Sequence, residues 1–63
     1  MMSLEAYQDY VINLLVNVHN FTEQKVLEML GNDPIIPHCH MNGRDPAKVA
    51  ASLASKWTRW NQA

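Results

Sequence analysis

The segment from Ser3 to Val18 constrains the fold of this chain more than any other segment. Its apolar residues recur with the period of an α-helix and share one broad face of it. This face consists of Leu4, Tyr7, Tyr10, Val11, Leu14, Leu15 and Val18. Polar residues recur every four positions on the opposite side, at Glu5, Asp9, Asn13 and Asn17. The pattern predicts an amphipathic helix with Ser3 as its N-cap and the core against its apolar face.

Two further apolar residues, Ile12 and Val16, lie outside this face and beside the acidic residues. A helix that is apolar on nearly two sides usually has two neighbours. A chain of 63 residues with one cysteine forms no internal disulfide, and a domain of this size buries only about 60% of the surface that its unfolded chain exposes. We therefore expect the second neighbour to be another molecule, with coverage by a chain terminus as the alternative.

Two further helices are predicted along the chain. Thr22 is a suitable N-cap for a helix of about two turns, and Gly31 is suited to the left-handed conformation that often follows a helix. Asp45 and Pro46 are suitable as the N-cap and first residue of a helix that continues to about Asn61. Both of these helices therefore have clear start signals in the sequence.

The connection between these two helices, residues 32–44, contains Pro34, Pro37 and an Asn-Gly turn signal. The prolines argue against a continuous helix and favour extended conformations for the residues that precede them. We expect an irregular loop here. The predicted fold is an all-α single domain, residues 1–63, in which a long helix, a short helix and a third helix after the Pro/His-containing loop form a three-helix bundle.

The sequence His38-Cys39-His40 lies in this predicted loop. In an extended segment His38 and His40 point the same way, as two ligands of one metal would. Zinc takes three or four ligands, however, and two histidines two positions apart match no established zinc motif. Cys39 would point away from both imidazoles, and so small a core leaves little room for a substrate pocket. We expect an exposed polar loop, no cofactor and no enzymatic activity.

Targeting features of the sequence favour a cytoplasmic location. The sequence has no basic start followed by an apolar core and a cleavage site, which would mark a signal peptide. No apolar run approaches the roughly 18 residues that a membrane span needs. A single cysteine fits a reducing compartment better than an oxidising one. We expect a soluble cytoplasmic protein with no membrane partner.

Charge is distributed unevenly, although the net charge is only −1. The first 33 residues carry five acidic residues and one basic residue, whereas residues 34–63 carry four basic residues and one acidic residue. The two halves either complement each other within the fold or present a basic helix to a partner. The basic residues of the second half are Arg44, Lys48, Lys56 and Arg59. With Trp60 beside them they make nucleic-acid binding the alternative function, although the whole chain is slightly acidic.

The remaining hypothesis is a protein-protein interface. Three short helices cannot hide all the apolar and aromatic surface that the sequence contains, and Tyr and Trp are common at interfaces. The candidate interface residues are Tyr7, Tyr10, Ile12, Val16, Trp57 and Trp60. We expect a small non-enzymatic interaction module, acting as a regulator or inhibitor and self-associating as a homodimer.

Overall fold

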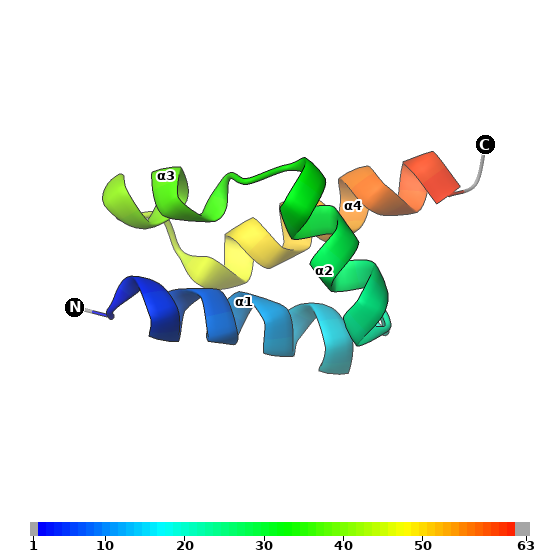
Figure 1. The fold of residues 1–63 in the computed structure, drawn as a ribbon, viewed down its shortest axis with the longest axis horizontal. Coiled ribbons are helices and arrows are strands. Elements are labelled where there is room, and N and C mark those ends of the chain that lie inside the picture. The colour runs from blue at the N-terminus through cyan, green and yellow to red at the C-terminus, as the bar shows by residue number, and fades with distance from the viewer. Residues whose placement is uncertain (1, 62–63) are drawn as a thin grey trace.

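The computed structural model describes residues 2–61, and the side chains of residues 2–58. Four helices follow one another along the chain (Figure 1): α1 at Leu4–Asn17, α2 at Glu23–Asn32, α3 at Ile36–Met41 and α4 at Pro46–Asn61. The all-α fold class is confirmed, and no strand occurs among these residues. The number of helices was predicted wrongly, as four are present instead of three.

The predicted helix starts are confirmed by side-chain caps. The Ser3 hydroxyl accepts a hydrogen bond from the backbone N–H of Ala6 at 3.1 Å. The Thr22 hydroxyl accepts one from the backbone N–H of Lys25, also at 3.1 Å. Before α4, an Asp45 carboxylate oxygen accepts one from the Ala47 N–H at 3.0 Å. Each cap satisfies one of the backbone donors that the first turn of a helix leaves free.

One hydrophobic cluster forms the core and draws on all four helices. α1 contacts each of the other three, and it packs most closely with α4. In Figure 1, α1 and α4 lie side by side, α3 lies towards the N-terminal end of α1, and α2 lies towards its C-terminal end. The buried residues are Tyr7, Val11 and Leu15 of α1, Val26 and Met29 of α2, Ile36 and Cys39 of α3, and Val49, Ala50, Leu53 and Ala54 of α4.

The segment predicted as an irregular loop contains the extra helix. Pro37 lies in the first turn of α3, where its missing N–H breaks no helical hydrogen bond. Ile36 is therefore helical and not extended as predicted, and its side chain is buried with that of Cys39. Burial of these two side chains stabilises a helix of one and a half turns, which is too short to be stable in isolation.

α2 does not end at Gly31, the glycine that was predicted to follow it. α2 continues through Gly31 to Asn32, and its end is satisfied by the Asp33 N–H, which donates to the Met29 carbonyl at 2.8 Å. The left-handed conformation occurs instead at Asn20, with φ of 63°, and at Gly43, with φ of 66°. Gly43 confirms the predicted Asn-Gly turn, because an L-residue other than Asn or Asp is strained at this φ.

None of the helices in residues 2–61 has the length and apolar character that crossing a membrane requires. The large apolar side chains that are exposed lie on several elements. Among them are Leu4, Tyr10, Val18, Leu27 and Met41.

The core assignment predicts a sharp difference between two apolar residues of α2. Met29 is fully buried, whereas Leu27 is 64% exposed. Met29→Ala should lower the free energy of unfolding by about 2–5 kcal/mol, because it removes buried contacts and leaves a cavity. Leu27→Ala should change it by less than about 0.5 kcal/mol. Urea denaturation followed by circular dichroism measures both, and equal midpoints for the two variants would contradict the assigned orientation of α2.

Candidate functional site

An open row of apolar side chains runs along α1. Tyr10, Leu14 and Val18 are four residues apart, so they lie nearly in line on one side of the helix. Tyr10 is 45% exposed and Val18 is 61% exposed, while Leu14 is half-buried against the core. We call these three residues the α1 stripe. They belong to the broad face that was predicted to lie against the core. Only the part of that face with Tyr7, Val11 and Leu15 is covered by the other helices.

The outer edge of the α1 stripe is polar and carries no charge. Ala6, Asn13 and Asn17 follow the stripe on its solvent side, as the 100° step per residue requires. The amide nitrogen of Asn17 donates to the amide oxygen of Asn13 over 3.4 Å. The stripe therefore has hydrogen-bonding groups beside it without a formal charge.

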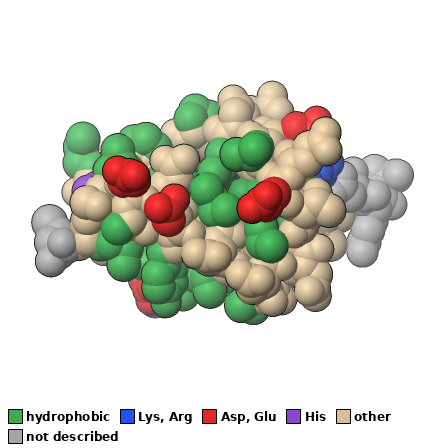
Figure 2. Space-filling model, turned by 60° about the horizontal axis from the view of Figure 1, so that its bottom comes forward, with side chains coloured by type: hydrophobic (Ala, Val, Ile, Leu, Met, Phe, Trp, Pro, Cys, Tyr) green, Lys and Arg blue, Asp and Glu red, His purple; other side chains and the backbone are tan. Residues whose placement is uncertain are grey.

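Ile12 and Val16 lie on the other flank of α1. Ile12 is about 160° from Tyr10 around the helix axis, because the two are two residues apart. Both Ile12 and Val16 are half-buried and pack against the core cluster. Their exposed neighbours are Glu5 and Asp9, and Figure 2 shows acidic and hydrophobic side chains side by side on one face of the molecule. The structure therefore separates the predicted interface residues of α1 into two surfaces.

Tyr7, the remaining predicted interface residue of α1, is a core residue. Only 4% of it is exposed, and its hydroxyl donates a hydrogen bond to the Arg44 carbonyl oxygen at 2.7 Å. Its ring meets the His40 ring edge to face, with the centroids 5.3 Å apart. Burial raises the pKa of the Tyr7 hydroxyl above 10.0, electrostatic interactions with Cys39 and Asp45 act in the same direction, and Arg44 opposes them. Tyr7 thus ties α1 to α3 and to the turn before α4.

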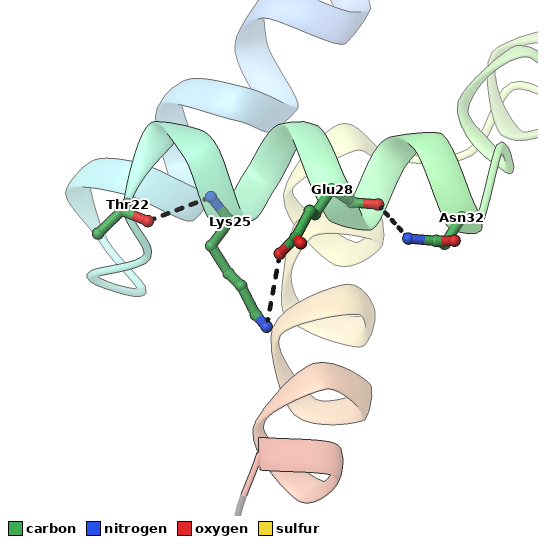
Figure 3. Close-up of polar contacts among 4 residues, drawn as sticks. All are labelled: Thr22, Lys25, Glu28 and Asn32. Atoms are coloured by element: carbon green, nitrogen blue, oxygen red, sulfur yellow. Dashed lines mark hydrogen bonds and ion pairs between the residues drawn. The ribbon is translucent and has the colours of Figure 1, made fainter.

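Trp57 is half-buried between α4 and α2. The Lys25 amine lies 5.4 Å from the centre of the indole ring, within the range of a cation–π contact. Lys25 also forms an ion pair with Glu28, with a nitrogen–oxygen distance of 3.8 Å, and Figure 3 shows both side chains on α2. The indole N–H of Trp57 is buried and has no hydrogen-bond partner among the described atoms. The side chain of Trp60, also predicted at the interface, lies outside the described residues.

Of the three described side chains of the predicted basic ridge, two lie together and the third lies elsewhere. Arg44 and Lys48 line the same cleft between α3 and α4. Lys56 is directed elsewhere, since its amine lies 2.5 Å from an Asp33 carboxylate oxygen in an ion pair that joins the basic and acidic halves of the chain. The side chain of Arg59, the fourth residue of the ridge, is not among those described.

The two histidines lie on different sides of α3. Residues two apart on a helix are about 160° apart around its axis, and the extended geometry predicted for them is wrong. His40 Nε2 lies 2.6 Å from the Met2 carbonyl oxygen, whereas His38 Nε2 lies 3.1 Å from the side-chain nitrogen of Asn42. Within the described part of the chain, no three His, Cys, Asp or Glu side chains are grouped as metal ligands would be.

Sequence reasoning missed the cleft and the α1 stripe for different reasons. The cleft has a wall made by α3, which was predicted as a loop. Of the stripe, only Tyr10 was predicted at an interface, and Leu14 and Val18 were assigned to the core. The apolar face of α1 nevertheless spans about 140° around the helix, more than a narrow seam against one neighbour requires. That width was a usable signal, but it does not say which edge the other helices leave open.

Comparison with known proteins gives no guide to function. No protein-family model matches the chain, and neither a curated protein nor a solved structure has significant similarity to it.

The buried Tyr7 hydroxyl predicts a pH-dependent contribution to stability. Tyr7→Phe should lower the free energy of unfolding by about 1 kcal/mol at neutral pH, because the Arg44 carbonyl loses its donor. The contribution is fully present below pH 10, the ordinary pKa of tyrosine, and is lost as pH rises through the raised pKa of the folded state, because the unfolded chain releases its proton first. The deficit of Tyr7→Phe should therefore shrink in alkaline solution.

Urea denaturation across this pH range measures the difference between the two proteins. Tyr10→Phe is the matched control, because Tyr10 is 45% exposed and its hydroxyl has no hydrogen bond among the described residues. A deficit for Tyr7→Phe that stays constant with pH would contradict the role assigned to its hydroxyl.

Proposed function

We propose that this protein is a small non-enzymatic protein-protein interaction module that self-associates through the α1 stripe. The observation that carries the proposal is the exposure of Tyr10 and Val18 in line with Leu14 on a helix whose opposite edge is covered. Aromatic and aliphatic side chains in such a row are typical anchors of helix–helix contacts. A regulator or inhibitor that works by occupying such a contact fits this surface.

A second copy of the chain is the partner that the charges favour. A two-fold dimer places the same surface of both molecules together, so any charge within that surface lies close to a like charge of the other molecule. The α1 stripe and its neighbours Ala6, Asn13 and Asn17 are uncharged. The flank with Ile12 and Val16 carries Glu5 and Asp9, which would bring like charges close in the same arrangement. The stripe is therefore the better homotypic surface.

Antiparallel packing suits the order of side chains in the stripe. With the two-fold axis at Leu14, the Tyr10 ring of each molecule lies against Val18 of the other. The large and small side chains then alternate across the contact, as good packing requires. The asparagines beside the stripe have both donors and acceptors with which to bond across the edge of the contact.

The size of the stripe predicts a weak and reversible dimer. Val18 lies eight positions after Tyr10, which corresponds to about 12 Å along a helix axis. A contact along this length buries less than the roughly 1,200 Å² of the smallest standard interfaces. A weak dimer keeps the stripe available for exchange with an apolar helix of another protein, which is what a regulator needs.

Nucleic-acid binding through the basic ridge is the weaker alternative. It relied on Arg44, Lys48, Lys56 and Arg59 acting along one surface. The ion pair between Lys56 and Asp33 neutralises one of these four charges. Steep salt dependence, the mark of phosphate binding, requires several free cations together.

The α1 stripe predicts a concentration-dependent mass that polar substitutions abolish. The wild-type mass should rise from 7.2 kDa towards twice that value between micromolar and millimolar concentration. Tyr10→Gln with Val18→Gln should remain at 7.2 kDa, because glutamine is compatible with a helix but removes the apolar contact. Sedimentation equilibrium measures this, and circular dichroism checks that the helices are retained.

Leu27→Gln is the matched control for this experiment. Leu27 is 64% exposed on α2, so this variant loses an equally accessible apolar side chain that lies away from the stripe. This variant should associate as the wild type does. A wild-type protein that stays monomeric throughout, or a stripe variant that associates unchanged, would refute the proposal.

A further inference from the structure

The cleft between α3 and α4 is independent of the α1 stripe and has the features of a ligand site. Its volume is about 650 Å³, within the range of about 300–1,000 Å³ that is typical of small-molecule sites. Its lining comes from α3, from the turn that follows and from the first two turns of α4. We propose that this cleft binds a small organic carboxylate with an apolar body.

The apolar part of the cleft would hold the body of the ligand. Ile35, Cys39 and Val49 contribute to its lining, and Cys39 and Val49 are themselves at least nine-tenths buried. Side chains from two helices thus form an apolar surface next to polar groups. A ligand that covers this surface gains the hydrophobic free energy of the area that it removes from water.

Two cations stand at the polar part of the cleft. Arg44 and Lys48 both line it, and neither forms an ion pair among the described residues. The guanidinium of Arg44 can hold both oxygens of a carboxylate, and Lys48 supplies a second charged donor. The Ser52 hydroxyl, one helical turn after Lys48, lines the same cleft. A carboxylate placed here could accept hydrogen bonds from all three of these side chains.

The backbone of Arg44 is held in place by two hydrogen bonds. Its N–H donates to the Cys39 carbonyl at 3.0 Å, and its carbonyl accepts the Tyr7 hydroxyl at 2.7 Å. The backbone from which the guanidinium extends is therefore fixed to α3 and α1. Such anchoring lowers the entropy that a binding residue loses when its ligand arrives.

The net charge of the cleft selects a monoanion. Asp45 offsets one of the two cations, and its carboxylate is already engaged as the acceptor of the Ala47 N–H. His38 also lines the cleft, where its Nε2 lies 3.1 Å from the side-chain nitrogen of Asn42. One net positive charge matches a carboxylate, whereas a phosphate dianion would remain partly unpaired.

Three probes separate the charge of the ligand from its apolar body. Benzoate has both, acetate has only the charge, and benzamide has only the ring. Titration of the folded protein with each, followed by the backbone amide chemical shifts, should give saturable shifts for benzoate at the residues of the cleft. Acetate and benzamide should each bind about tenfold more weakly, because one class of contact is lost.

Two substitutions in the cleft and one outside it test the assignment. Arg44→Gln and Lys48→Gln should each weaken benzoate binding about tenfold. Lys56→Gln removes the same charge from α4 but lies outside the cleft, paired with Asp33, and should leave the affinity unchanged. Circular dichroism verifies that each variant is folded.

Three results would overturn the assignment. They are benzoate shifts that do not saturate, benzamide binding equal to benzoate binding, and equal weakening by Lys48→Gln and Lys56→Gln. The last would mean that only the overall charge attracts the anion. Because the cleft is lined by no residue of the α1 stripe, these outcomes do not depend on self-association.

Discussion

Burial of one face of α1 is the interaction on which the rest of this structure depends. Tyr7, Val11 and Leu15 form that face, and each of the other three helices packs on α1. α2 and α3 have ten and six residues, too few to be stable alone in water. Their helical state is therefore a consequence of packing, and a substitution that weakens the α1 face weakens every helix at once.

The same constraint explains why surfaces are left open. The three neighbouring helices do not cover the whole width of the apolar face of α1, so the edge with Tyr10 and Val18 remains exposed. α3 is anchored to the core by Ile36 and Cys39, and its position against the start of α4 leaves a cleft between them. The Tyr7 hydroxyl bond to Arg44 connects the two features, because it joins the buried side of α1 to a wall of the cleft. Core and candidate sites are thus parts of one packing arrangement.

The charge asymmetry of the sequence has a partial structural explanation. The ion pair between Lys56 and Asp33 joins the basic half of the chain to the acidic half within one molecule. Arg44 and Lys48, in contrast, have no such partner among the described residues and face the cleft. Complementarity within the fold therefore accounts for part of the asymmetry, and the charges of Arg44 and Lys48 lie where a ligand could use them.

The sequence by itself determined the three longer helices and their starts. Ser3, Thr22 and Asp45 cap helices through hydrogen bonds within three residues, and such local interactions can be recognised without knowing the fold. Only the tertiary structure decided that α3 is a helix, that His38 and His40 face apart, and which edge of α1 stays exposed. These features depend on contacts between segments distant in the sequence, whose free energy outweighs local preference in elements this short.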